Sequence, residues 1–136
     1  IGANKIGAVC MPINWRLAPP EIDYIVDNGK AKLMMADAAF PYGKIQTFKT
    51  EEFSSWYGKF EAQDPGHTPD LDDTALQLYS SGTTGLPKGV MLTNANMFTL
   101  FQEIATYWRF DQESINVVAM PLFHIAGSRF FAVDGM

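Results

Sequence analysis

Short apolar runs and one helical repeat alternate in the first part of the chain. Residues 8–13 form an apolar run of strand length beside a proline, and residues 32–36 form another. Between them, two prolines open residues 19–29, where apolar side chains recur at helical spacing until Gly29 provides a C-terminal stop. The order strand, helix, strand predicts a βαβ unit and a mostly parallel sheet with flanking helices, which is an α/β fold.

The middle of the chain is less regular. Aromatic residues are frequent but weakly periodic over residues 40–60, and we expect a helix near residues 50–60. Residues 61–74 contain five acidic side chains, two prolines and a glycine, which is typical of a solvated linker. We expect His67, within this linker, to be solvated as well.

Regular patterns return after the linker. Residues 75–79 and 90–92 read as two strands, and Thr93 or Asn94 can cap a helix over residues 95–109. The apolar stripe of that helix predicts packing in the core. Residues 115–120 form one more apolar run, which predicts a buried strand ended by proline.

Composition narrows the class of protein. With 47% hydrophobic and 18% charged residues, the 136-residue chain is typical of a globular domain. Its net charge of −5 and scattered basic residues argue against nucleic-acid binding and a polybasic membrane anchor. No apolar run approaches the ~18 residues that a membrane span needs.

The single cysteine and the chain ends add two expectations. Cys10 lies in an apolar run, so we expect a buried structural thiol; a reactive thiol is the alternative. A lone cysteine fits a reducing compartment such as the cytoplasm. The chain begins with Ile1 and ends after an apolar stretch at residues 130–133 without a cap, so we expect it to be a piece of a longer protein.

The most informative segment is a loop at residues 80–89. It combines three glycines, four hydroxyl side chains and Lys88 within ten residues. Glycines allow special dihedral angles and a close approach of the backbone, whose N–H groups can form an anion-binding concavity, and lysine adds a point charge. The spacing is not that of the Walker A motif, because Gly82 and Gly85 are too close together and Pro87 precedes the lysine. The loop indicates a phosphate site, and a surface turn with a solvated lysine is the alternative.

The residues around this loop resemble a known family. Residues 79–94, with the sequence YSSGTTGLPKGVMLTN, closely resemble the signature phosphate loop of the adenylate-forming (AMP-binding) superfamily. Residues 11–37 resemble the upstream region of bacterial fatty-acyl-CoA ligases, and residues 120–127, MPLFHIAG, resemble the next downstream motif of the family. This resemblance implies part of a large N-terminal α/β domain, with a βαβ part at 1–60, an acidic linker at 61–74, and the phosphate loop and acyl-pocket motif at 75–136. It implies that the family's C-terminal domain is absent.

The resemblance also implies a reaction and a set of site residues. An acid, which we expect to be a fatty acid, attacks the α-phosphate of ATP with the help of Mg²⁺, and coenzyme A then displaces AMP from the acyl-adenylate. Lys88, Thr83 and Thr84 would be catalytic, and Phe123 and His124 would border the acyl pocket. We assign no metal ligands. The residues expected to contact ATP are Ser80, Ser81, Gly82, Thr83, Thr84, Gly85 and Lys88.

Several points stay open at this stage. Asn94 stands where many ligases have histidine, and we expect it to cap a helix without loss of function. His124 can alternatively be a packed histidine. The family's adenine-binding segment, ribose-binding aspartate, hinge and C-terminal lysine do not occur in these 136 residues, so we expect the fragment alone to be inactive. An aryl-CoA ligase of the coumarate or benzoate type, a peptide-synthetase adenylation domain and an inactive interaction module that keeps the loop are the alternatives. The paired threonines at 83–84 and residues 14–17 favour an acyl-CoA ligase.

Overall fold

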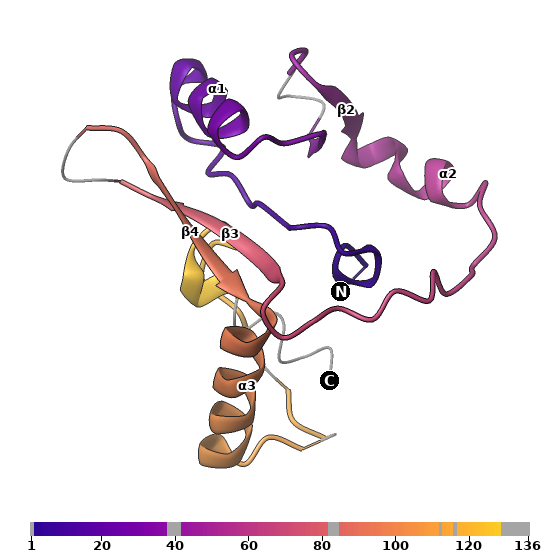
Figure 1. Ribbon diagram of the computed structural model, residues 1–136, viewed down its shortest axis with the longest axis vertical. Coiled ribbons are helices and arrows are strands. Elements are labelled where there is room, and N and C mark those ends of the chain that lie inside the picture. Colours follow the sequence, from indigo (N-terminus) through magenta and orange to yellow (C-terminus); the bar gives the residue numbers. More distant parts are fainter. Residues whose placement is uncertain (1, 38–41, 82–84, 112, 116, 129–136) are drawn as a thin grey trace.

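The computed structural model describes residues 2–37, 42–81, 85–111, 113–115 and 117–128 (Figure 1). The chain combines helices with short parallel and antiparallel strand pairs, which confirms the predicted α/β class. The elements are η1 (Asn4–Ile6), α1 (Pro19–Asn28), β1 (Leu33–Ala36), β2 (Gln46–Lys49), η2 (Thr50–Glu52), α2 (Phe53–Tyr57), β3 (Thr74–Ser80), β4 (Lys88–Thr93) and α3 (Asn94–Trp108).

The strands pair differently from the predicted βαβ unit. β1 pairs in parallel with β2, whereas β3 and β4 form an antiparallel hairpin. Residues 8–13 do not pair with β1; instead Cys10 forms a parallel bridge to Leu76 of β3. The backbone N–H of Cys10 donates to Ala75 O at 3.1 Å, and Gln77 N–H donates to Cys10 O at 2.9 Å. The predicted first strand is therefore a short addition to the second edge of β3.

Helix α1 begins where the sequence predicts it. Pro19 opens it, and Glu21 Oε2 accepts a hydrogen bond from Ala18 N–H at 2.8 Å. This contact is half of a capping box, because Ala18 has no side-chain acceptor of its own. The apolar face packs inward, and its buried residues are Ile22, Ile25 and Val26.

The end of α1 corrects the expected role of Gly29. The helix stops at this glycine as predicted, but Gly29 has a φ of −76°, and the left-handed residue is Lys30, with a φ of 52°. A Cβ at position 29 would lie 2.5 Å from Met11 Sδ. Met11 therefore packs against the backbone of Gly29, and a larger residue there would have to displace the Met11 side chain.

Helix α1 is also tied to the segment that leads into β2. Asp23 accepts a hydrogen bond from Tyr42 Oη at 3.0 Å and forms an ion pair with Lys44 at 2.7 Å. The hydrogen bond from Lys44 is the main reason that the pKa of Asp23 lies below its ordinary value. These contacts hold α1 beside the β1–β2 pair.

The predicted helix at residues 50–60 is confirmed in a shorter form. A 3₁₀ turn, η2, runs directly into α2, which ends at Tyr57. The Trp56 ring lies 4.8 Å from that of Phe48 on β2 and 5.4 Å from that of Phe60, measured between centroids. Aromatic packing of this kind explains the high aromatic content of a segment with little periodicity.

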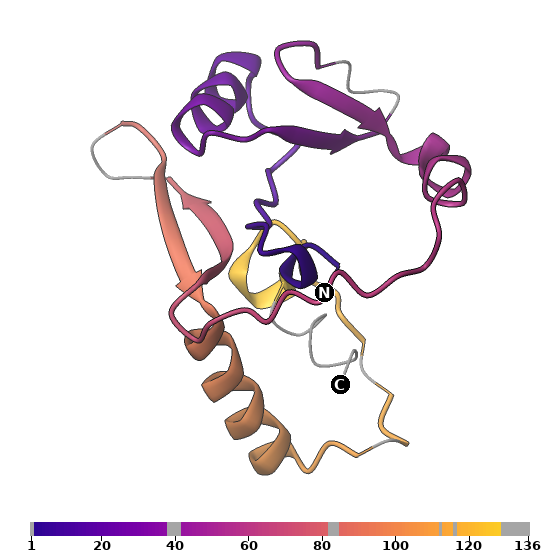
Figure 2. The same cartoon turned by 45° about the vertical axis from the view of Figure 1, so that its right-hand side comes forward.

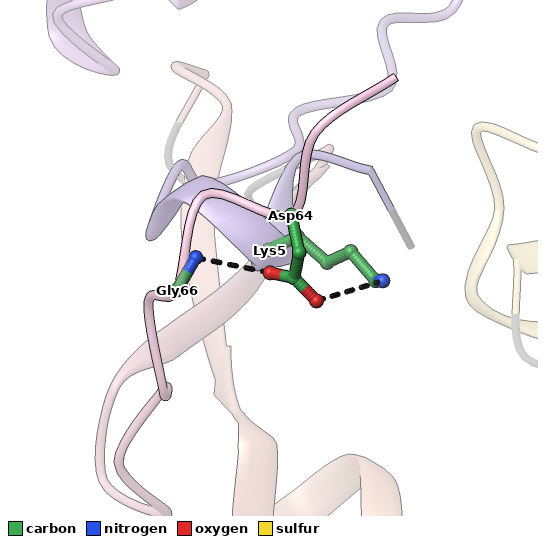
Figure 3. A network of polar contacts seen from close by, with 3 residues as sticks. All are labelled: Lys5, Asp64 and Gly66. Carbon is green, nitrogen blue, oxygen red and sulfur yellow. Dashed lines mark hydrogen bonds and ion pairs between the residues drawn. The ribbon is translucent and has the colours of Figure 1, made fainter.

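The linker is exposed and without helix or strand between residues 61 and 73, as predicted. It is nevertheless held against the N-terminal turn. Asp64 forms an ion pair with Lys5 at 3.9 Å and accepts a hydrogen bond from Gly66 N–H at 3.0 Å (Figure 3). A Cβ on Gly7 would lie 2.8 Å from His67 Nε2, so the exposed His67 ring rests on the backbone of η1.

The linker also reaches the start of α3. Thr93 is the N-cap of this helix: its Oγ1 accepts from Asn96 N–H at 3.2 Å, and its own N–H donates to Asn96 Oδ1 at 3.0 Å. Asn94 occupies the first helical position, and its Nδ2 donates to Asp70 O at 2.9 Å. The prediction that Thr93 caps the helix is confirmed. Asn94 does not cap it but joins its first turn to the linker.

Two predictions of burial are wrong. Of the apolar stripe on α3, Phe101 is buried, but Trp108 is 56% exposed. Residues 117–120 and the described residues before them form no strand, and the side chains of Ile115 and Val117 are 93% and 83% exposed. A strand is stable only beside a hydrogen-bonded neighbour, and the described residues offer none to this run.

An open arrangement of the elements explains this exposure. The chain has 10,036 Å² of accessible surface, whereas a compact protein of 15.1 kDa would have about 7,100 Å². Cys10 is likewise exposed, contrary to expectation, because β3 meets its backbone but leaves its side chain uncovered. Among the described residues, no helix combines the length and apolarity needed to cross a bilayer.

Thr93→Ala tests the cap of α3. We expect a loss of about 1 kcal/mol in the free energy of unfolding, because an N–H group of the first turn loses its acceptor. Urea unfolding of the protein measures this loss. Thr99→Ala, an exposed position within the same helix, is the matched control and should cost little. Equal losses for the two variants would contradict the capping role.

Candidate phosphate-binding site

The predicted phosphate loop closes the β3–β4 hairpin. Ser80 is the last residue of β3, Lys88 is the first residue of β4, and the two are paired across the ladder. Ser80, Ser81 and Lys88 are exposed. The structure therefore brings two hydroxyl groups and an ammonium group to one end of a hairpin. The predicted site residues Gly82, Thr83 and Thr84 lie outside the described residues.

The glycines of the loop serve different purposes. Gly85 has a φ of 97°, a conformation that side chains with a Cβ rarely adopt, so the turn requires it. The described glycines with positive φ are Gly7, Gly66 and Gly85, so Gly89 does not have the special dihedral angle expected of it. A Cβ on Gly89 would lie 2.5 Å from Gln77 Nε2 and 3.1 Å from Tyr79 Cζ. Gly89 thus makes room for side chains of the opposite strand.

Tyr79 is a residue of the site that the sequence did not single out. It is the cross-strand partner of Gly89, and its Oη donates to Asn28 Oδ1 of α1 at 2.7 Å. Gln77 Nε2 in turn donates to Tyr79 Oη at 3.3 Å. Partial burial is the main reason that the pKa of Tyr79 lies above its ordinary value, and Tyr24 raises it further. The sequence does show a tyrosine immediately before the loop. It does not show that this tyrosine bonds to Asn28, because the two residues are 51 positions apart.

The chemistry of this hairpin end suits an anion. Lys88 supplies a full positive charge and three donors, and the serine hydroxyls supply further donors. Gly85, with its positive φ, shapes the described end of the loop beside these groups. Helix α3 begins only after β4 ends, so its dipole does not point into the loop.

The second predicted motif forms a compact turn of its own. His124 N–H donates to Pro121 O at 3.0 Å, and His124 Nδ1 accepts from Ala126 N–H at 3.3 Å at the start of a helical turn over residues 125–128. Gly127 is buried, and a Cβ there would clash with the Pro121 carbonyl. His124 is exposed and Phe123 is half-buried.

The two motifs are not close together in this structure. In both views, residues 120–128 lie away from the loop end of the hairpin (Figure 1, Figure 2). The two motifs do not follow the ends of two neighbouring parallel strands, because residue 115 and residues 117–120 form no strand and β3 belongs to an antiparallel hairpin.

Comparison with known proteins extends these observations. Residues 1–133 match the sequence model of the AMP-binding enzyme family. A fatty acid–[acyl-carrier-protein] ligase of Streptomyces coeruleorubidus is 33% identical over 93% of this chain and 27% of its own length. A crotonobetaine/carnitine–CoA ligase of Salmonella arizonae is 34% identical over 91% of this chain and 28% of its own length. The chain therefore spans about a quarter of the length of these curated relatives.

Solved structures agree with the sequence match. The o-succinylbenzoate coenzyme A synthetase of Bacillus subtilis, in complex with ATP and a magnesium ion, superposes with a TM-score of 0.80. Its sequence is 26% identical, and the match covers 98% of this chain and 29% of that one. The fold, the phosphate loop and a family match over nearly all of its length together show that this chain belongs to the AMP-binding enzymes, the adenylate-forming family.

Proposed function

We propose that this chain is the phosphate-loop portion of an ATP-dependent acid–thiol ligase. A carboxylate oxygen of the substrate attacks the α-phosphorus of ATP, and the bond to the pyrophosphate leaving group breaks. The sulfur of coenzyme A then attacks the acyl carbon of the acyl-adenylate, and AMP leaves. The observation that supports this proposal best is the hairpin end at which Lys88 stands opposite Ser80 in a glycine-shaped turn.

In this proposal the loop binds the β- and γ-phosphates. Lys88 neutralises charge that accumulates on pyrophosphate as it leaves, which stabilises the transition state more than the ground state. Ser80, Ser81 and the Gly85 turn would orient the phosphate oxygens. Gly82, Thr83 and Thr84 are assigned by their positions in the motif, the two threonines together with Lys88 as catalytic residues.

Magnesium would be held mainly by the nucleotide. The described residues contain no group of three or more His, Cys, Asp or Glu side chains that could hold a metal ion. Mg²⁺ commonly keeps several waters and binds through substrate phosphates with few protein ligands. The residues of the hairpin fit this mode, since they offer phosphate donors rather than a carboxylate cage.

The acid substrate we propose is a fatty acid. Residues 11–37 and the paired threonines of the loop support it, as does the fatty-acid ligase among the relatives. Phe123 and His124 would border the acyl chain. In this proposal, residues 1–60 are the first part of the domain, residues 61–74 are the acidic linker, and residues 75–136 carry the phosphate loop and the acyl-pocket motif of a cytoplasmic enzyme. Activation of carnitine-type or aryl acids is the alternative that two of the named relatives suggest.

The general proposal is tested on the whole protein that carries this sequence. Supplied with ATP, Mg²⁺, coenzyme A and a series of fatty and aromatic acids, it should release AMP and pyrophosphate only when an acid is present. Nucleotide release that does not depend on any acid would refute the proposed reaction. The acid with the highest kcat/KM identifies the substrate class.

Lys88→Ala should lower the rate of acyl-adenylate formation about 10-fold or more. One charge-assisted hydrogen bond to phosphate contributes ~1.5–3 kcal/mol, which corresponds to this loss. Acid-dependent exchange of pyrophosphate into ATP measures the first half-reaction alone. Lys59→Ala removes another exposed lysine outside the hairpin and is the matched control. A rate unchanged by Lys88→Ala would return this residue to the role of a solvated surface lysine.

His124→Ala should raise the KM for the acid while the KM for ATP changes little. His124 caps a helical turn as well, so its loss also removes the acceptor for Ala126 N–H. His124→Asn separates the two effects, because asparagine is a good N-cap but lacks the imidazole. If His124→Asn restores the KM for the acid, the histidine acts only as a cap. If both variants raise that KM equally, the imidazole itself faces the substrate.

A further inference from the structure

We propose that Tyr79 and Asn28 are positioning residues for the phosphate loop: their hydrogen bond fixes the loop end of the β3–β4 hairpin to the end of α1. The inference rests on the proposed function, since it concerns how that hairpin is held for ATP. Neither residue is expected to touch the nucleotide. Each would act by holding the strand ends of β3 and β4 that carry Ser80 and Lys88.

The contact joins two elements at the point where the hairpin needs support. Tyr79 Oη donates to Asn28 Oδ1 at 2.7 Å, and Asn28 is the last residue of α1. In both views, α1 lies on the loop side of the hairpin, whereas α3 continues from its other end (Figure 1, Figure 2). Along the outer edge of β3, backbone bonds to the segment at Cys10 are made by Ala75 and Gln77. The Tyr79 side chain adds a further link, to α1, two residues beyond Gln77 along β3.

The position of Tyr79 in the ladder makes this link relevant to the site. The pair Tyr79–Gly89 directly precedes the pair Ser80–Lys88 in the register. An isolated two-stranded hairpin is marginally stable and separates most easily at its ends. Holding Tyr79 in place therefore restricts the separation and twist of the two residues that would face phosphate.

Gly89 fits the same arrangement from the other strand. The Tyr79 ring lies across the bare backbone of Gly89, where a Cβ would approach Tyr79 Oη to 3.2 Å and Gln77 Nε2 to 2.5 Å. Gln77 Nε2 donates to Tyr79 Oη on the same side. A side chain on residue 89 could be accommodated only if the ring or Gln77 moved. The Gln77 amide ends a flexible side chain and can swing aside, so the firmer limit is the Tyr79 ring. Gly89 thus forms, with Tyr79 and Asn28, one brace at the loop end of the hairpin.

Tyr79→Phe in the whole ligase tests the brace, because it removes the hydroxyl but keeps the ring. We expect the KM for ATP to rise about 3-fold to 10-fold, the range that one net hydrogen bond supports, while the KM for the acid changes little. Asn28→Ala should give the same pattern, and the double variant should be no worse than either single variant. Asn28→Asp keeps an acceptor for Tyr79 Oη and should restore an ATP KM close to that of the wild type.

Tyr42→Phe is the matched control. It removes a tyrosine hydroxyl that also bonds to α1, at Asp23, but on the side of the β1–β2 pair. We expect Tyr42→Phe to lose about as much stability as Tyr79→Phe. Its KM for ATP should not change. Equal changes in that KM for Tyr42→Phe and Tyr79→Phe would overturn the inference, because both would then reflect general destabilisation.

Hydrogen exchange separates this inference from the proposed function. In the nucleotide-free protein, Tyr79→Phe should speed amide exchange over residues 85–89, and Tyr42→Phe should not. Unchanged exchange would overturn the brace even in an active ligase. If exchange is faster but the protein forms no acyl-adenylate, the structural role of the Tyr79–Asn28 bond stands. The proposed function, and with it the positioning of ATP, would then be refuted.

Gly89→Ala should reproduce the defect of Tyr79→Phe from the opposite strand. Gln77 can swing aside, but the Tyr79 ring, 3.1–3.2 Å from the added Cβ, must also shift, so we expect the KM for ATP to rise and exchange over residues 85–89 to quicken. Gly43→Ala is the control, since a Cβ at that position meets nothing within 4 Å. A normal KM for ATP together with normal exchange over residues 85–89 would show that Gln77 alone gives way and would remove Gly89 from the brace.

Discussion

The site depends on the register of β3, which has hydrogen-bonded neighbours on both edges. The Cys10 segment pairs with one edge and β4 with the other, while Ala75, Leu76 and Leu78 are buried. A slip of one residue in β4 would turn its side chains to the other face of the hairpin. It would also separate Lys88 from Ser80. The burial of a few apolar side chains on β3 therefore determines where the charge of the site lies.

Features with a local cause could be predicted from the sequence. Helix α1 follows from two prolines, Glu21 and an apolar repeat, and α3 follows from Thr93 and the residues after it. Strand β3 and the exposed linker were also recognisable from composition alone. The candidate phosphate loop could be identified because its glycines, hydroxyl groups and lysine are concentrated in ten consecutive residues, although three of them lie outside the described structure.

Features with a distant cause could not be predicted. Nothing in residues 8–13 indicates that Cys10 meets β3 rather than β1, and nothing near Asn28 indicates Tyr79. Periodicity identified the apolar stripe of α3, but it cannot tell which element covers a stripe, and Trp108 remains exposed. Gly89 shows the same limit within the motif itself, since the sequence suggested a dihedral angle and the structure shows a steric requirement set by the opposite strand.

The use of a hairpin rather than a helix start changes what the loop must provide. In a Walker A loop, the phosphate lies at the N-terminus of a helix. The helix dipole favours the negative charge there, and the hydrogen bonds of the helix fix the direction of its first-turn N–H groups. Here the loop is followed by β4, so in the proposed site the positive charge would come from Lys88, whose backbone is only as fixed as the two strands are. A point charge on a flexible stem loses selectivity for the transition state when its base moves. Side-chain contacts that stiffen the end of the hairpin, above all Tyr79 with Asn28 and Gly89, therefore supply the rigidity that a helix would supply elsewhere.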